Sequence, residues 1–200
     1  MKIENVEVFG FRTAIHGMRN PMNSWDLSDS SFDSDGKIWL GQKDNELALK
    51  LIKAGTEHRK FLRLIHIQCF LTLPRYIWQE LDTYKISTVR MSCSTMHKLG
   101  SMDLTVEDFQ DKNVIKEVLD ELNELGAAYR IAKDVSVLRE MKQILPEGFL
   151  QSADYDMTYE TAMNIYYQRK NHRMSEWSGE NGICKWIESL PLMNIWLKLK

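Results

Sequence analysis

The sequence has few of the features that mark secreted, disulfide-bonded or membrane-spanning proteins. It contains three cysteines in 200 residues, Cys69, Cys93 and Cys184, and they form no C-x-x-C pair. An odd number of widely spaced cysteines argues against a disulfide framework and against a structural zinc site. No uninterrupted apolar run exceeds three residues, which is too short for a membrane span or a signal-peptide core. We therefore expect a cytoplasmic protein with reduced thiols and no membrane partner.

Excess charge and the common cofactor motifs are also missing. There are 26 Lys and Arg against 28 Asp and Glu, for a formal charge of −2, so we expect no bulk nucleic-acid binding. The chain has no G-x-G-x-x-G, no G-x-x-x-x-G-K-[ST] and no H-E-x-x-H, which removes the usual support for dinucleotide, triphosphate and zinc-protease sites. The five histidines are scattered and form no ligand-spaced pair. We predict no metal site.

With 44% apolar residues and only four prolines, the chain is expected to fold as a single domain over residues 1–200. Residues 16–43 carry Asn, Asp, Ser, Gly and Pro at turn-forming density. This segment is too long for an ordinary connection, and loops of such length are usually functional or mobile. Trp25 and Trp39 indicate that parts of it pack down. We expect either a lid or a subunit-contact loop.

Hydrophobic periodicity predicts strands in the first third of the chain and helices after it. The expected strands are 3–9 and 61–73. Expected helices are 44–54 with Asp44 as its cap, 75–85 led by Pro74, one marked by Val114, Val118, Leu122 and Leu125, one marked by Val135, Leu138 and Met141, and further helices after Tyr159. Segregated strands and helices indicate the α+β class, with a mostly helical C-terminal half.

The most unusual stretch is 82–97, DTYKISTVRMSCSTMH, in which seven of sixteen residues bear hydroxyls. Lys85, Arg90 and His97 add cationic or switchable donors, so the segment is suited to surround an anion. The alternative is a polar surface loop whose side chains bond to the backbone. Cys93 with His97 four residues later is only a weak nucleophile-and-base pattern. No catalytic residue is assigned.

A second cluster, QRKNHR at 168–173, has four residues of six that can carry positive charge. Arginine is suited to forked recognition of phosphate, and the alternative is a solvated helix end whose cations offset the helix dipole. A third candidate is Arg19, in the segment MRNPMNSW, which we expect to reach a ligand.

Taken in order, the helix at 44–54, the strand beginning TEHRKFLRLIHIQCFL, the helix PRYIWQELDTYK and the run ISTVRMSCSTMH resemble the core of flavin-dependent thymidylate synthases. The block LPEGFLQSADYDMTYETAMNIYYQRKNHRMSEW resembles their closing segment, in which a helix carries an Arg that holds the substrate phosphate. The likeness covers half of the chain. The chain is also similar to small uncharacterised phage and prophage proteins that carry DTYK, SCSTMH and RKNH-x-x-x-EW strings.

The resemblance implies a central antiparallel or mixed sheet flanked by helices, and a homotetramer whose sites are built from several subunits. It implies a nucleotide ligand, with Arg169 matching the phosphate-holding Arg by position. It also implies FAD as cofactor, but the R-H-R motif and following serines of that family are replaced by Thr83-Tyr84-Lys85, Thr88, Cys93 and Thr95. Because those groups hold flavin phosphates and the uracil ring in the family, dUMP methylation is in doubt and the cofactor stays unassigned.

We expect the two clusters to converge across neighbouring protomers on one anionic ligand. The predicted ligand-binding residues for base and sugar are Tyr84, Lys85, Thr88, Ser92, Cys93, Ser94, Thr95 and His97, and those for phosphate are Arg169, Asn171, His172 and Arg173. The first hypothesis is a phage-type nucleotide-binding homo-oligomer that sequesters its ligand, for example a host defence signal. The second is a flavin- or folate-dependent enzyme that methylates or hydroxymethylates a pyrimidine nucleotide. The third is a protein–protein interaction module, for which the apolar tail 195–199 offers a strip unless it docks on its own domain.

Overall fold

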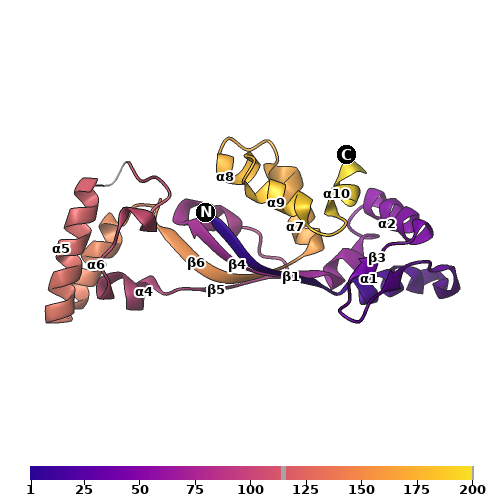
Figure 1. Ribbon diagram of the computed structural model, residues 1–200, viewed down its shortest axis with the longest axis horizontal. Helices are drawn as coiled ribbons and strands as arrows, with labels where there is room; N and C mark the ends of the chain where they lie inside the picture. The colour runs from indigo at the N-terminus through magenta and orange to yellow at the C-terminus, as the bar shows by residue number, and fades with distance from the viewer. Residues whose placement is uncertain (114–115, 200) are drawn as a thin grey trace. The chain divides into compact units, whose positions relative to one another are not determined.

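The computed structural model describes residues 1–113 and 116–199 (Figure 1). Its strands are β1 Lys2–Phe9, β2 Ser31–Phe32, β3 Ile38–Trp39, β4 His66–Pro74, β5 Thr88–Ser92 and β6 Leu150–Thr158. Its helices are α1 Phe11–Arg19, α2 Gln42–Ala54, α3 Arg75–Leu81, α4 Thr95–Lys98, α5 Lys116–Ala132, α6 Val135–Ile144, α7 Tyr159–Arg169, α8 Ser175–Ser178, α9 Ile183–Ser189 and α10 Met193–Trp196. Among the described residues, no helix is both long and apolar enough to cross a bilayer.

The main sheet has four antiparallel strands in the order β1-β4-β6-β5. Its central strands follow the period-2 pattern that a half-buried strand requires. In β4 the buried side chains alternate through Ile67, Cys69, Leu71 and Leu73. A second, two-stranded sheet pairs β2 with β3 antiparallel. Strands and helices alternate along much of the chain, from β1–α1 to β6–α7, so the expected segregation of strands into the first third was wrong. The antiparallel sheet with many helices nevertheless confirms the α+β class.

Backbone contacts divide the chain into two compact units. The helical unit contains residues 1–4, 70–83 and the described part of 90–155. The terminal unit contains residues 5–69, 84–89 and the described chain from 156 onward. Each strand of the main sheet has one end in each unit. The prediction of a single domain concerns how the units are joined, and it stays a prediction.

The helical unit has its own apolar core beneath α5 and α6, which lie side by side (Figure 1). The core residues that are almost completely buried are Leu99, Leu104, Phe109, Leu122, Leu138, Met141 and Leu145. The predicted helices at 118–125 and 135–141 are the ones that build it, because their apolar residues recur at helical spacing. The expected start at Val114 lies outside the described residues.

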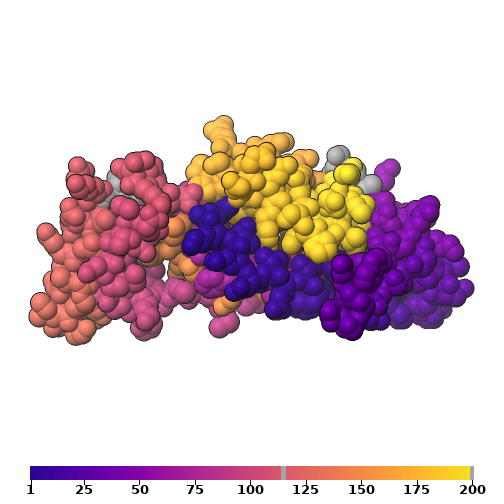
Figure 2. Space-filling model, viewed as in Figure 1, coloured from indigo at the N-terminus to yellow at the C-terminus, as the bar shows by residue number. Residues whose placement is uncertain are grey.

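The core of the terminal unit is dominated by aromatic side chains. Tyr159 packs edge-on against Phe11 and Trp196, and Trp196 packs edge-on against Phe61. Figure 2 shows the C-terminal segment (yellow) directly against the N-terminal third (purple), where α10 contacts α2. Trp196 and Leu197 are buried, so this part of the tail docks on its own chain rather than forming a free apolar strip.

The turn between β1 and α1 requires glycine. Gly10, between β1 and α1, has φ 98°, and a Cβ placed there would lie 2.0 Å from the carbonyl oxygen of Leu64. The left-handed conformation and the close backbone approach are both easy only for glycine. Gly10 therefore fixes the turn from the sheet into α1.

Several predicted boundaries were wrong. Residues 60–64 form a 3₁₀ turn and not the start of a strand, because Phe61 and Leu62 are neighbours and both are buried. The expected loop at 16–43 begins inside α1 and contains two 3₁₀ turns and the β2–β3 hairpin. The strands β5 and β6 were missed. In β6, two aspartates alternate with the buried Ala153, Tyr155 and Met157, so the stretch looks polar in sequence. β5 lies in the hydroxyl-rich stretch 82–97, for which a polar loop was the alternative.

Candidate functional site

The predicted basic cluster at 168–173 lies at the end of α7, which is a rigid support. The helix follows β6 directly, and Thr158 caps it by accepting a hydrogen bond at Oγ1 from the backbone N–H of Thr161. Tyr159, Ala162, Met163 and Ile165 are fully buried along its length. A helix anchored in this way places its last residue, Arg169, with little freedom.

Arg169 is held by aromatic side chains from two segments. Its Nε donates to the hydroxyl of Tyr84 at 3.0 Å, and its Cζ lies 5.0 Å from the ring centroid of Trp177. The Tyr84 hydroxyl in turn donates to Oε1 of Gln168 at 3.0 Å. Trp177 is completely buried, so its ring is held in place and supports the guanidinium from one side. A planar, oriented guanidinium is well suited to forked contact with a phosphate or a carboxylate.

The residues after Arg169 extend the positive charge. Lys170, Asn171 and Arg173 are exposed, and His172 is half-buried. The loop is ordered by its own hydrogen bonds: Nδ1 of His172 accepts from the backbone N–H of Met174 at 3.2 Å, and the His172 carbonyl accepts from the hydroxyl of Ser178 at 2.7 Å. Because Nδ1 is an acceptor, the neutral ring carries its proton on Nε2.

The chain from Tyr84 to Thr88 is tied to the same helix. The hydroxyl of Thr88 donates to the Tyr84 carbonyl at 2.8 Å, and the hydroxyl of Thr161 in α7 donates to the carbonyl of Ile86 at 2.9 Å. Lys85 is exposed. Three residues of the predicted set from the hydroxyl-rich stretch, Tyr84, Lys85 and Thr88, thus belong with Arg169 to the terminal unit. The contact between Tyr84 and Arg169 lies within one chain. The convergence of the two clusters across protomers stays a prediction.

The remaining predicted residues of that stretch belong to the helical unit. Ser92 ends β5, and the backbone N–H of Cys93 continues the pairing by donating to the Ser152 carbonyl at 2.8 Å. Ser94 caps α4 by accepting at Oγ from the backbone N–H of His97. Cys93, Ser94 and Thr95 line a cavity of about 240 Å³ together with Lys98 and Asp108, and His97 is exposed outside this lining. The predicted ligand set is therefore divided between the two units.

Arg90, the third cation of the hydroxyl-rich stretch, has local partners. Its Cζ lies 3.9 Å from the ring centroid of Trp78, its Nη1 donates to Oδ2 of Asp82 at 2.7 Å, and its Nη2 donates to Oε1 of Gln151 at 2.9 Å. These contacts join β5, the end of α3 and β6 inside the helical unit. Arg90 therefore orders the edge of the sheet.

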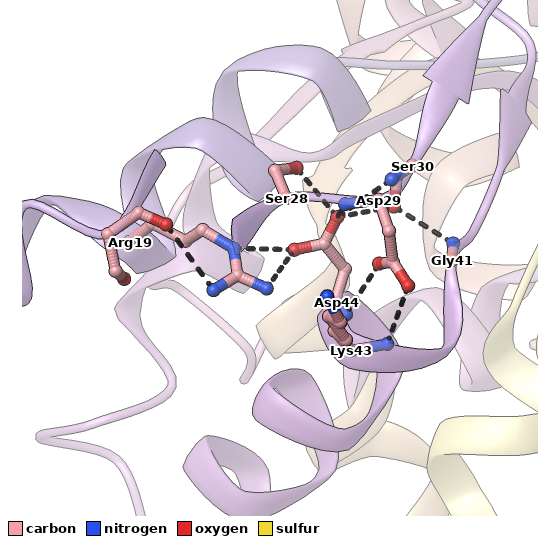
Figure 3. A network of polar contacts seen from close by, with 8 residues as sticks. Arg19, Ser28, Asp29, Ser30, Gly41, Lys43 and Asp44 are labelled. Atoms are coloured by element: carbon pink, nitrogen blue, oxygen red, sulfur yellow. Dashed lines mark hydrogen bonds and ion pairs between the residues drawn. The ribbon is translucent and has the colours of Figure 1, made fainter. Parts of the chain in front are cut away.

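Arg19 is buried in a closed polar network and does not point into open space (Figure 3). Its Nε and Nη2 both lie 2.7 Å from Oδ1 of Asp44. The other carboxylate oxygen of Asp44 accepts hydrogen bonds from the side chains of Ser28 and Ser30 at 2.7 Å each. Because Asp44 neutralises the charge of Arg19 inside the protein, Arg19 is not part of the proposed pocket. Asp44 is correspondingly not a helix cap: α2 begins at Gln42, and Asp29 accepts the N–H groups of Lys43 and Asp44 instead.

Two further ionic groups in the terminal unit were not found from the sequence. Glu160, in the first turn of α7, pairs with Arg59 and Arg63. Nδ1 of His66 lies 3.0 Å from Oδ1 of Asp156, across β4 and β6. These partners are far apart along the chain, so no local pattern announces them. Trp177, which contacts Arg169, was identified from the sequence as an apolar helix position and as part of the string RKNH-x-x-x-EW, but its contact with Arg169 was not predicted.

Thiol chemistry has little support outside Cys93. Cys69 and Cys184 are buried, and Cys93 is exposed. Burial, with a smaller contribution from Glu188, raises the pKa of the Cys184 thiol to about 11, so this group is neutral at physiological pH and a poor nucleophile. Within the described ranges, no three His, Cys, Asp or Glu side chains gather closely enough to hold a metal ion.

The fold matches those of solved flavin-dependent thymidylate synthases. A structure of ThyX from Helicobacter pylori complexed with FAD and dUMP aligns with a TM-score of 0.74 and 16% identity, over 98% of each chain. A second structure of that enzyme with FAD and dUMP gives 0.71 and 17%, over 98% of this chain and 97% of the other. The UMP/dUMP methylase PolB from Streptomyces cacaoi, bound with 5-Br dUMP, gives 0.62 and 10%, over 99% and 93%. No family model and no curated protein matches the chain in sequence.

Proposed function

Because the chain has the fold of the flavin-dependent thymidylate synthases, we propose that it is a nucleotide-binding protein that holds a ligand phosphate through Arg169. The three solved structures named above all contain dUMP or a brominated dUMP. They resemble this chain along almost its whole length, which supports a pocket of the same general kind. We further propose a homo-oligomer, acting in the cytosol of a bacterial host and of phage origin.

The observation that carries this proposal is the fixed orientation of Arg169. The hydroxyl of Tyr84 lies at 3.0 Å from its Nε, and the ring of Trp177 supports its guanidinium plane. An arginine oriented before binding loses less side-chain freedom when it contacts a phosphate. The exposed cations Lys170 and Arg173 strengthen the attraction for an anion.

The residues present do not fit FAD as it is held in the resembled family. The segment that matches the R-H-R motif offers one cation, the exposed ammonium of Lys85. Its hydroxyls have internal partners, since Tyr84 contacts Arg169 and Gln168, and Thr88 donates to the Tyr84 carbonyl. This donor set favours binding without flavin chemistry, and we derive no reaction step through the cofactor.

A second candidate function is enzymatic modification of a pyrimidine nucleotide. The structural similarity to a UMP/dUMP methylase favours it, because that protein shows the same fold with a methylase activity. We rank it below sequestration because the flavin-binding groups are replaced. Under sequestration the protein binds a nucleotide, for example a host defence signal, and returns it unchanged.

Isothermal titration calorimetry with purified protein tests the phosphate contact. A thermal-shift screen first selects the ligand from dUMP, UMP, cyclic dinucleotides, ADP-ribose and FAD, because a ligand of the folded state raises the melting temperature. Arg169→Ala should then weaken the selected ligand by about 30-fold, the value of a charged hydrogen-bond pair of about 2 kcal/mol.

Arg139→Ala is the matched control, because Arg139 is an exposed arginine on α6 of the helical unit. The Arg139→Ala variant should bind the selected ligand with the same affinity as the unaltered protein. If Arg169→Ala leaves every nucleotide's affinity unchanged, the proposal is wrong and the interaction-module hypothesis gains. Chromatography of the recovered ligand separates the two nucleotide hypotheses: an unchanged ligand and colourless protein support sequestration, whereas a converted ligand or yellow protein supports the enzyme.

A further inference from the structure

The terminal unit contains a large cavity that shares no residue with the Arg169 site. Its volume is about 690 Å³, within the range of about 300–1,000 Å³ that is usual for small-molecule sites. Three segments far apart in sequence form it: β1 with the start of α1, the tip of the β2–β3 hairpin, and the connection from α9 to α10.

The walls of this cavity are mostly apolar and include aromatic rings. Val6, Val8 and Phe11 line one side, Ile38 a second, and Trp186 and Leu192 a third. The polar lining residues Asp35, Lys37 and Ser189 are all exposed, whereas Phe11 is buried and Val8, Ile38, Trp186 and Leu192 are half-buried. Val6 and Pro191 are exposed as well, so the mouth combines polar groups with these two apolar side chains, and the lining further in is apolar.

The segments that form the cavity are held in place rather than loosely packed. The segment before the hairpin, residues 28–30, is fixed by Asp44, whose Oδ2 accepts the backbone N–H groups of Asp29 and Ser30 in addition to two serine hydroxyls (Figure 3). On the opposite wall, Leu192 has φ 64°, a conformation that costs a leucine energy. Strained non-glycine residues persist where the surrounding structure imposes them, and they concentrate at ligand sites.

We propose that this cavity binds a ring-containing small molecule with an apolar body and a single polar end. Aromatic walls favour a planar apolar body, which gains from stacking and edge contacts with Trp186 and Phe11. The polar end faces the mouth, where Lys37, Asp35 and Ser189 meet it. The site is independent of the nucleotide site, so it gives the protein a second ligand or an effector.

The test uses the full-length protein and the fluorescent probe N-phenyl-1-naphthylamine, an uncharged ring compound whose emission rises in apolar surroundings. We expect saturable binding at one site per chain. Val6→Arg should weaken it at least about tenfold, because the guanidinium would enter the cavity. Val135→Arg is the matched control: Val6 and Val135 are exposed valines, 41% and 60%, and Val135 lies on α6 outside the cavity. The control should bind the probe as the unaltered protein does.

Ser189→Trp provides a second test that fills the cavity from an exposed position, and it should also weaken probe binding. The anionic analogue 8-anilinonaphthalene-1-sulfonate shows which charge the mouth of the cavity prefers. If it binds more tightly than the uncharged probe, and Lys37→Ala removes that difference in affinity, the polar end of the natural ligand is assigned as an acid. The proposal is overturned if Val6→Arg and Ser189→Trp bind the probe normally. It is also overturned if Val6→Arg reduces the oligomer mass by light scattering, since the cavity would then be covered by a second copy. Loss of nucleotide binding in Arg169→Ala, with probe binding retained, separates this site from the proposed function.

Discussion

Arg19 and Asp44 form a buried ion pair that joins the end of α1 to the start of α2, with Nε and Nη2 of Arg19 each 2.7 Å from Oδ1 of Asp44. Both side chains are at most 5% exposed. The same carboxylate receives Ser28 and Ser30, so one buried charge fixes two helices and the entry to the hairpin. Removing one partner would leave the other charge buried and unpaired, which is the costly case for internal ion pairs.

Asp44→Asn should therefore lower the free energy of unfolding by about 3 kcal/mol, measured by urea denaturation. Asp35→Asn is the control, since Asp35 is an exposed aspartate at the hairpin tip whose side chain contacts its neighbour Ser34. Its stability should stay within about 0.5 kcal/mol of the unaltered protein. Equal stability of the two variants would contradict the structural role assigned to the network.

The pH dependence of stability should reveal the same carboxylate. Burial alone would raise the pKa of Asp44, but hydrogen bonds from Ser30, Ser28 and Arg19 outweigh it and hold the pKa below its ordinary value. Such a group stabilises the protein above its unfolded pKa of about 3.9, and the stabilisation is lost as pH falls through the lower folded pKa. The stability difference from Asp44→Asn should be constant between about pH 5 and 7 and shrink below about pH 4. A difference that persists undiminished in acid would argue against this assignment.

Tyr84→Phe tests whether the tyrosine hydroxyl orients Arg169. The variant keeps the ring and removes the group that accepts from Nε and donates to Gln168. We expect about fivefold weaker nucleotide binding by calorimetry, a loss of about 1 kcal/mol and smaller than that of Arg169→Ala. Tyr76→Phe, on α3 of the helical unit, serves as the comparison and should bind normally. An affinity unaffected in both variants would remove Tyr84 from the site.

Arg90→Lys should lower the stability by about 1–2 kcal/mol in a denaturant titration. A lysine keeps the charge but loses the planar group that stacks on Trp78 and bonds to Asp82 and Gln151 together. Arg139→Lys, an exposed exchange on α6, should be silent. If both exchanges are equally tolerated, the stacked guanidinium contributes no more than its charge.

Gly10→Ala should be more harmful than a surface glycine exchange. The added Cβ would meet the Leu64 carbonyl oxygen, and the φ of 98° would be strained for alanine. We expect a loss of at least about 2 kcal/mol in thermal or urea unfolding. Gly148→Ala is the control, because a Cβ at Gly148 would have no neighbouring atom within 4 Å, and this variant should unfold almost as the unaltered protein does.

Elements with regular apolar spacing were predictable from the sequence, and elements built on polar residues were not. β1, α6 and α7 were found because apolar residues recur with the right period. β6 was missed because two aspartates, Asp154 and Asp156, alternate with its buried residues and make the stretch look polar. The partner of Asp156 is His66 on β4, which is far away in sequence. β5 was missed because an edge strand with exposed hydroxyls resembles a loop in composition.

The candidate site was predictable in its residue types and not in its pairings. Charge density at 168–173 and the hydroxyls at 82–97 indicated that these segments matter together, and Tyr84 does contact Arg169. Arg19 is an arginine like Arg169, and its neighbours in the sequence are typical of an exposed loop. Its guanidinium nevertheless pairs with the carboxylate of Asp44, 25 positions away. A buried ion pair between distant positions leaves no local trace in one sequence. Ser94 shows the complementary case, in which a hydroxyl expected to contact ligand caps a helix.

The anchors of the β2–β3 hairpin lie on either side of it, at residues 28–30 and 41–44, and its tip at Gly36 has no neighbour within 4 Å of a would-be Cβ. Gly36 itself has φ 83°, which favours glycine, and Oδ1 of Asp33 accepts the backbone N–H groups of Asp35 and Lys37. Side-chain exchanges at the exposed positions 34, 35 and 37 can therefore reshape the mouth of the large cavity while α1 and α2 keep their positions. Related chains that differ at these three positions would acquire new small-molecule preferences on an unchanged scaffold, and a laboratory library confined to residues 34, 35 and 37 would test the same variation.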